Sequence, residues 1–339
     1  MTPIASHITA FLRHRLVDER NASRNTCESY TYAFKLLFEF AADRLKVPPV
    51  KLCFEQIDAS LVVAFLSHLE TQRNNGANSR NIRLAAIKSF MHFMQFRLPS
   101  ALEQIQRVLA IPTKKVETKL IKHLTVSEMQ AVLDAPVPTD REGIRDRAML
   151  HLCFAAGLRV SELIGLQLSD LKLQPDASIR VLGKGRKERC LPLWKQTATA
   201  LRAWMAVRGE MPCANLFVNA RGQAMTRSGF EYILSKHAKQ AAVDCPSLAQ
   251  KRISPHVLRH TCALTVLQAT NDLRKVSLWL GHASIQTTEI YTRADPSVKL
   301  EALQSMVAPE LRTGRFKATD ALIASLNPRS LSKGSDASV

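Results

Sequence analysis

A stretch near the C-terminus carries histidine, arginine and tyrosine side chains at spacings that suit phosphate chemistry. His256, Arg259 and His260 follow one another at positions i, i+3 and i+4, which places all three near one face of a helix. Ser254 and Pro255 precede them and are residue types that favour the first positions of a helix. Because a helix N-terminus attracts anions and a guanidinium binds phosphate, this segment is a good place for a phosphate group.

The same stretch ends in His282 and Tyr291. A phenol has a pKa of about 10, so a tyrosine attacks only a strongly activated target with a base at hand. A phosphodiester under attack gains charge on its non-bridging oxygens, and arginine binds such oxygens bidentately. These residue types in a basic chain predict phosphate chemistry with Tyr291 as the nucleophile. We expect Tyr291 to lie outside the core, because the run around it, QTTEIYTR, has few apolar residues.

The order of these residues resembles the C-terminal signature of the tyrosine recombinases, a family that includes phage integrases, Xer resolvases and related transposases. The matching pattern is His256-x-x-Arg259-His260, then Leu280-Gly281-His282, then Tyr291. The resemblance suggests an Xer-like site-specific recombinase or a transposon-borne integrase. It also implies a second arginine and a lysine further upstream.

Two upstream motifs match the rest of that family pattern. Arg159 follows a Gly-Leu pair, and Glu162 lies three residues later, as in the first catalytic box of the family. Residues 179–193, IRVLGKGRKERCLPL, have two β-prone runs around a Gly-Lys-Gly turn, which predicts a hairpin. By the resemblance, Lys184 falls on the catalytic lysine, and Lys187 is the alternative if the register differs.

The resemblance implies six catalytic residues, which are Arg159, Lys184, His256, Arg259, His282 and Tyr291. The two arginines would clamp the phosphate, the lysine would protonate the departing 5′-oxygen, and His256 would take the proton of the tyrosine. His282 would hydrogen-bond the scissile phosphate, and Glu162 would orient and neutralise its neighbouring arginine. His260 is expected to be a core residue bonded to the backbone. The tyrosine would become linked to the 3′-phosphate, so neither ATP, nor a metal, nor another cofactor is expected.

Composition agrees with a protein that binds nucleic acid. The chain has 339 residues and a formal net charge of +18, which suggests about two domains and an anionic partner. It lacks an apolar run long enough to cross a bilayer, and its first residues lack the apolar segment of a secretory signal. Seven dispersed cysteines without a Cys-x-x-Cys pair indicate reduced thiols in the cytoplasm and argue against structural zinc.

The expected fold class is mainly α with a small β-hairpin or sheet (α+β). By the resemblance, residues 1–111 should form a helical, SAM-like core-binding domain that binds DNA, 112–124 a basic linker, and 125–310 the tyrosine-recombinase catalytic domain; residues 311–339 are expected to form a mobile tail. The residues predicted to contact DNA are basic and lie in the first domain, the linker and the hairpin: Arg80, Arg83, Lys88, Lys114, Lys115 and Lys187.

Local signals place the individual elements. Helices are expected from the start to about residue 20 and over about 25–45, 79–97, 195–207, 228–242 and 298–306, with a short strand at 216–218. Asp58 is the expected N-cap of another helix. Capping boxes formed by Ser100 with Glu103 and by Thr125 with Glu128 should begin two more.

Three functions share these features. The first is a site-specific recombinase that cuts and rejoins DNA strands through a 3′-phosphotyrosyl intermediate, in integration, excision, resolution or transposition. Its partners would be double-stranded DNA and a tetramer of itself on paired sites; a second recombinase is a further candidate, and no membrane is expected. A type IB topoisomerase would use the same chemistry as a monomer, but the Leu-Gly-His box and the compact size favour the recombinase. A DNA-binding regulator with a dead active site is the third, and the complete catalytic set argues against it.

Overall fold

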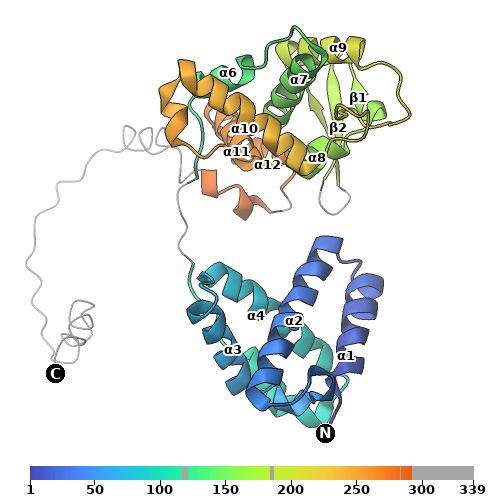
Figure 1. The fold of residues 1–339 in the computed structure, drawn as a ribbon, viewed down its shortest axis with the longest axis vertical. Coiled ribbons are helices and arrows are strands. Elements are labelled where there is room, and N and C mark those ends of the chain that lie inside the picture. The colour runs from blue at the N-terminus through green and yellow to red at the C-terminus, as the bar shows by residue number, and fades with distance from the viewer. Residues whose placement is uncertain (117–120, 184–186, 283, 292–339) are drawn as a thin grey trace, which may run out of the picture. The chain divides into compact units, whose positions relative to one another are not determined.

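The computed structural model describes residues 1–116, 121–183, 187–282 and 284–291. The chain divides into two compact units, Met1–Lys119 and Leu120–Val339 (Figure 1). Each unit has its own hydrophobic core. The expected helix at 298–306 and the expected tail lie outside the described residues.

The N-terminal unit is built from helices alone in its described part. Its main helices are α1 (Ile4–Ala10), which continues into the π-helix η1 (Phe11–Glu19), α2 (Arg24–Leu45), α3 (Ala59–Thr71), α4 (Ala77–Met94) and α5 (Leu102–Leu109). Short 3-10 turns η2 (Pro49–Lys51), η3 (Phe54–Gln56) and η4 (Pro99–Ala101) connect them. Aromatic rings fill the centre, where the Phe11 ring lies 5.4 Å from the Phe90 ring and 5.9 Å from the Phe34 ring.

Capping signals account for some helix starts in this unit and fail at one. The carboxylate of Asp58 accepts a hydrogen bond from the Leu61 amide at 2.7 Å, as the sequence predicts. The predicted capping box of Ser100 with Glu103 is wrong, because α5 begins at Leu102 without a side-chain cap. Pro99 opens the 3-10 turn η4 and draws Ser100 inside it, so the serine is not at the N-cap.

The C-terminal unit packs helices around a small sheet. Its helices are α6 (Val126–Asp134), α7 (Arg141–Ala155), α8 (Val160–Gly165), α9 (Lys195–Arg208), α10 (Arg227–Asp244), α11 (Pro255–Thr270) and α12 (Leu273–Leu280), with 3-10 turns η5 (Leu168–Asp170), η7 (Pro246–Gln250) and η8 (Ile285–Thr287). The sheet order is β1 (Leu171–Lys172), β2 (Ser178–Leu182) and β3 (Glu188–Pro192), all antiparallel. This arrangement confirms the predicted fold class.

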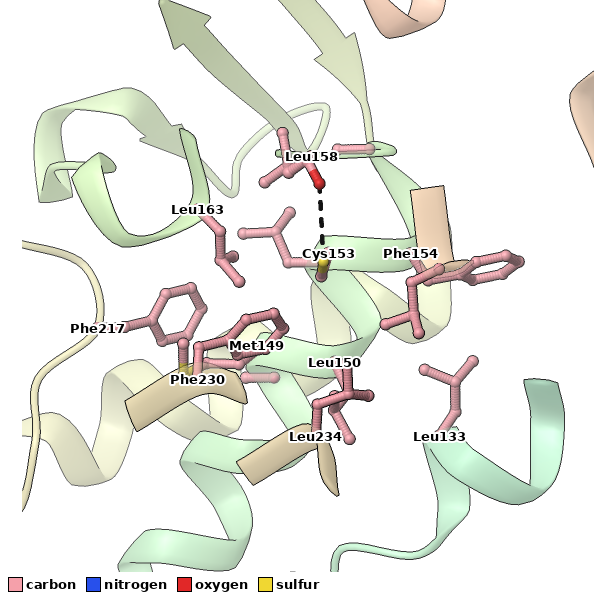
Figure 2. Packing of buried hydrophobic residues seen from close by; sticks show 14 of the residues in the cluster. Leu133, Met149, Leu150, Cys153, Phe154, Leu158, Leu163, Phe217, Phe230 and Leu234 are labelled. Carbon is pink, nitrogen blue, oxygen red and sulfur yellow. Dashed lines mark hydrogen bonds between the residues drawn. The ribbon is translucent and has the colours of Figure 1, made fainter. Parts of the chain in front are cut away.

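The core of this unit fixes the short helix α8. Leu163 of α8 is fully buried beside Met149 of α7 and Phe230 of α10 (Figure 2). Because burial of one leucine stabilises by roughly 1.5–3 kcal/mol, these contacts hold in place a helix too short to be stable alone. The packing of α8 in the core therefore fixes the position of Arg159 at its N-cap.

The hairpin prediction is confirmed and the strand at 216–218 is wrong. Strands β2 and β3 pair with Val181 opposite Arg189 and Arg180 opposite Cys190. At 216–218 the Leu216 amide bonds to the Leu166 carbonyl, and Val218 forms only an isolated bridge. The apolar residues there are buried because they fill the core, and they do not belong to a ladder. None of the described helices is long and apolar enough to cross a membrane.

Candidate active site

Gly157 lies where two of the sequence motifs meet in space: the Gly-Leu-Arg motif that contains it and the Leu280-Gly281-His282 motif. Gly157 ends α7 with φ of +56°, a conformation that side-chain-bearing residues rarely adopt. A Cβ at this position would lie 2.6 Å from a methyl of Leu280, so only glycine lets the α7 end approach the turn after α12. The Gly157 carbonyl also accepts a hydrogen bond from Arg259. Arg159 follows at the N-cap of α8.

A buried carboxylate, Glu162, lies at the centre of the arginine residues. Arg159 donates to it twice, from its amide at 3.0 Å and from Nη1 at 2.6 Å. Arg189 of β3 donates from Nη2 at 2.8 Å and from Nη1 at 3.3 Å. Burial alone would raise the pKa of Glu162, but the hydrogen bonds and charge of Arg189 and Arg159 outweigh it and lower that pKa. The carboxylate is therefore ionised at neutral pH.

The second predicted clamp residue, Arg259, is buried next to the same carboxylate. Its guanidinium donates to the carbonyls of Gly157 and Leu280, the latter at 2.8 Å, and lies 3.9 Å from Glu162. Burial and the repulsion of Arg159 lower the pKa of Arg259 to about 10, against the attraction of Glu162. It still carries its charge at neutral pH, so Arg159 and Arg259 bring two positive charges to one place.

Tyr291 is buried, and the expectation that it lies outside the core is wrong. Its side chain is 1% exposed and packs against Leu264 of α11 and Val276 and Leu280 of α12. The polar run around it misled the prediction, because the apolar neighbours come from distant parts of the chain. Burial raises the pKa of the Tyr291 phenol to about 12, although the charge of Arg259 works in the opposite direction.

The phenol of Tyr291 is hydrogen-bonded to His260 and not to His256, the predicted base. His260 Nδ1 lies 3.0 Å from the Tyr291 hydroxyl, so the predicted backbone hydrogen bond of His260 is wrong. Burial lowers the pKa of His260 to about 4, with further lowering by His256 and Arg259, so the ring is neutral and accepts from the phenol. His256, the predicted base, is exposed on the same helix, with its ring centred 6.5 Å from that of His260.

His282 also lies next to the Tyr291 ring. Its ring is nearly parallel to that of Tyr291 with the centroids 6.3 Å apart, and its Nδ1 lies 2.9 Å from the Thr288 hydroxyl. Burial lowers the pKa of His282 to about 4, and the charges of Arg259 and Arg159 add to this. At neutral pH it is an uncharged hydrogen-bonding group beside Tyr291.

The remaining predicted catalytic residue, Lys184, lies outside the described residues. Lys187 is described; its side chain is exposed, and its carbonyl accepts from the Gly183 amide at 2.8 Å. Arg189, two residues further on, was not predicted as a functional residue. Its sequence signal is its place at the end of the run GKGRKER, residues 183–189, which matches the Gly-Lys-Gly-x-Lys-x-Arg hairpin pattern of the tyrosine recombinases.

The predicted DNA contacts of the N-terminal unit differ in how free their charges are. Arg80 is only 7% exposed; its guanidinium donates to the Pro112 carbonyl at 3.3 Å and lies 3.8 Å from Glu70. Lys114 is exposed but pairs with the same Glu70 at 2.8 Å. The carboxylate therefore already compensates part of the charge of both residues, which remain predictions as DNA contacts.

The other three basic residues predicted for that unit, Arg83, Lys88 and Lys115, differ in how exposed they are. Arg83 is half-buried with its guanidinium 4.8 Å from the centre of the Tyr32 ring. Lys88 is half-buried on the same helix, and Lys115 is exposed.

None of the described residues forms a group of histidines, cysteines or carboxylates that could hold a metal ion.

Similarity to known proteins covers nearly the whole chain. Residues 122–297 match the phage integrase family, and residues 8–96 match the phage integrase N-terminal SAM-like domain. The chain is 43% identical over 324 residues to a Sinorhizobium fredii protein named integrase/recombinase y4rC, covering 96% of this chain and 98% of the relative. It is 35% identical over 314 residues to tyrosine recombinase XerC of Pelobacter propionicus, covering 92% and 98%.

Solved structures share the fold. The Tn1549 transposon integrase in complex with transposon right end DNA matches with a TM-score of 0.67 at 16% identity, covering 91% of this chain and 100% of the other. The XerH recombinase bound to a palindromic difH substrate matches with a TM-score of 0.64 at 22% identity, covering 84% and 81%.

Proposed function

The chain belongs to the phage integrase family of tyrosine recombinases, and on that premise we propose how its residues carry out strand exchange. It is a site-specific DNA recombinase. Its nucleophile, in our proposal, is Tyr291, which attacks a phosphodiester and becomes linked to the 3′-phosphate. A free 5′-hydroxyl remains and later attacks the phosphotyrosine, so the energy of the broken bond is kept in the covalent intermediate.

The proposed phosphate clamp is the pair Arg159 and Arg259. One observation carries this assignment: two arginines from two helices meet at Glu162, at 2.6 Å and 3.9 Å from its carboxylate oxygens. The Arg159 side chain is 30% exposed, so a DNA phosphate can reach it. Preorganised charge of this kind stabilises the oxygens of the transition state, where the negative charge grows, more than those of the ground state.

The nucleophile must leave its resting place before it reacts. A phenol that is 1% exposed cannot meet a DNA phosphate, and its raised pKa, about 12, keeps it protonated. We assign to His260 the task of holding the phenol in the resting chain, because it already accepts the phenol proton in a hydrogen bond. We assign to the exposed His256 the removal of that proton at the DNA. His282 then hydrogen-bonds the phosphate.

The leaving group needs a proton, because the 5′-alkoxide of deoxyribose is a poor leaving group. We propose Lys184 as the general acid, as the family pattern of the hairpin implies, with Lys187 as the alternative. Glu162 orients Arg159 and does not exchange protons with the substrate. Four basic residues outside the catalytic set are proposed to contact the DNA backbone: Arg83, Lys88, Lys115 and Lys187. Arg80 and Lys114 are proposed to bind the DNA backbone more weakly, because Glu70 compensates part of their charge.

The proposed setting is bacterial cytoplasm, with four copies of the chain on two paired DNA sites. The relative named integrase/recombinase supports an element-borne integrase, whereas the relative named tyrosine recombinase XerC supports a resolvase of the Xer type. Of these we propose the integrase, because the identity to the first relative is higher and spans more of the chain. Inverted repeats or transfer genes beside the coding sequence would support this choice.

A two-duplex assay tests the proposed reaction. Labelled duplexes covering the DNA that flanks the coding sequence are screened for binding, and the bound site is then offered with a second, unlabelled copy. A recombinase joins label to the second duplex, and Arg159→Ala abolishes this product. Relaxation of a supercoiled plasmid that lacks the site, without any joint product, would instead identify a topoisomerase, and binding without cleavage a regulator.

A further inference from the structure

We propose that Arg189 is a positioning residue that neutralises Glu162 and thereby leaves the charges of Arg159 and Arg259 available to the scissile phosphate. This inference rests on the proposed clamp role of those two arginines. Arg189 lies on strand β3, and its side chain is only 10% exposed. It is therefore poorly placed to bind DNA itself, and its effect has to pass through the groups that it touches.

The contacts of Arg189 are directed at the carboxylate. Its two terminal nitrogens, Nη1 and Nη2, bind the two oxygens of Glu162 at 3.3 Å and 2.8 Å, the fork geometry in which guanidinium and carboxylate pair best. Arg159 shares only Oε1 through its side chain, at 2.6 Å. The more complete ion pair of the carboxylate is thus the one with Arg189, which is 27 residues away in the sequence.

The charges of the cluster explain why this pairing matters. Glu162 carries one negative charge, and Arg159, Arg189 and Arg259 carry one positive charge each. With Arg189 on the carboxylate, the other two positive charges remain uncompensated and attract a phosphate. Without it, the buried carboxylate would be neutralised by Arg159, or by Arg259 from 3.9 Å away, and the clamp would lose charge and change its geometry.

Two glycines make room for this arginine, which supports a specific placement. A Cβ on Gly281 would lie 2.9 Å from Nη1 and 3.2 Å from Cδ of Arg189. A Cβ on Gly183 would lie 3.3 Å from Nη1 and 3.7 Å from Glu162 Oε1. The Arg189 side chain therefore packs between Gly183, which follows β2, and Gly281, which precedes His282. Its guanidinium links both places to Glu162.

The hairpin offers a matched control for the experiment. Arg180 of β2 also binds a carboxylate with two nitrogens, Nε at 3.1 Å and Nη2 at 3.0 Å from Asp170 Oδ1. It is more exposed than Arg189, and its partner Asp170 lies in η5, outside the catalytic cluster. Arg180→Met thus removes an arginine–carboxylate pair from the same hairpin without touching the clamp.

The experiment measures single-turnover cleavage of a nicked substrate at saturating protein, together with the Kd for the same DNA. We expect Arg189→Met to slow cleavage roughly a hundredfold, as loss of preorganised charge does, while Kd stays within about threefold because backbone contacts elsewhere carry affinity. Arg189→Lys, which keeps the charge but not the fork, should recover about tenfold of the loss. Arg180→Met should cleave at the parent rate.

A second substitution, Glu162→Gln, tests whether Arg189 acts by neutralising the carboxylate. Glu162→Gln removes the charge that Arg189 neutralises, so Glu162→Gln in the Arg189→Met chain should restore part of the cleavage rate and also remove any instability from an unpaired buried carboxylate. An Arg189→Met chain that cleaves like Arg180→Met, or a double variant slower than Arg189→Met, would overturn the inference. Should Arg189→Met not fold, Arg189→Lys and the double variant carry the same comparison. Undiminished cleavage by Arg159→Ala would instead refute the clamp, whatever Arg189 does.

Discussion

The hydroxyl of Tyr291 lies 3.0 Å from Nδ1 of His260, thirty-one positions apart in the sequence and inside a cluster of aliphatic side chains. The hydrogen bond links Tyr291 to α11, the helix that also carries Arg259. Burial by its neighbours and this hydrogen bond together stabilise the buried position of the Tyr291 side chain. As the proposed nucleophile, Tyr291 would have to exchange these contacts for the DNA phosphate before it reacts.

His260→Phe should lower the unfolding free energy of the protein by about 1–3 kcal/mol, because the buried phenol loses its acceptor while the ring volume is kept. Tyr291→Phe leaves His260 Nδ1 unpaired and should cost a similar amount. In the double variant neither polar group remains, so its loss should be smaller than the sum of the single losses. Chemical denaturation of the four proteins measures this, and strictly additive losses would mean that the hydrogen bond contributes nothing.

The same bond predicts a dependence on pH. The pKa of His260 falls from 6.5 to about 4 on folding, so the unfolded chain binds a proton first as pH is lowered. The stability contributed by neutral His260 is complete above about pH 6.5 and is lost as pH falls towards 4. Denaturation at pH 7.5, 6, 5 and 4 should therefore show a steeper loss for the parent than for His260→Phe. Parallel curves would contradict the lowered pKa.

Gly157→Ala should destabilise the C-terminal unit by about 1–3 kcal/mol, since alanine is strained at a φ of +56° and its Cβ would meet Leu280 at 2.6 Å. Cleavage should fall as well, because the Gly157 carbonyl that binds Arg259 would move. Gly165→Ala is the control: a Cβ there meets nothing within 4 Å. Thermal denaturation and cleavage of both variants check this, and equal behaviour would show that the close approach at 157 is unimportant.

Much of the fold could be predicted where the signal is local. Thr125 and Glu128 form the reciprocal hydrogen bonds of the predicted capping box, at 3.2 Å and 2.8 Å, because both partners lie within one turn. The hairpin likewise follows from residues adjacent in sequence. Ser100 shows the limit of such signals, because Pro99 one position earlier decided the outcome.

The candidate site was predicted as a set of residues but not as a set of contacts. The family pattern names Arg159, Arg259 and Tyr291, yet a pattern does not encode which groups pair. The burial of Tyr291 depends on side chains of α11 and α12, and the proposed role of Arg189, on β3, depends on the carboxylate of Glu162 in α8. Both are consequences of packing between distant segments, which no local window of the sequence contains.

Lys184→Ala should slow cleavage of ordinary DNA far more than cleavage of a substrate whose leaving group is a 5′-thiol, because a thiolate departs without a proton. Lys187→Ala on the same hairpin is the matched variant and should show no such preference. Rate constants for both substrates decide between the two lysines. If the sulfur substrate rescues Lys187→Ala instead, the general acid is Lys187, and if it rescues neither, the hairpin does not supply the acid.

The central claim is that Tyr291 forms the covalent bond to DNA, and mapping the adduct tests it most directly. The protein is incubated with a nicked duplex from which the short 5′-hydroxyl strand diffuses away, so that the intermediate accumulates. Proteolysis and mass spectrometry then locate the attached nucleotide among the four tyrosines at 30, 32, 232 and 291. We predict the adduct on Tyr291, and no adduct in Tyr291→Phe although that variant still binds the duplex. An adduct on Tyr30, Tyr32 or Tyr232, or one that persists in Tyr291→Phe, would contradict the account.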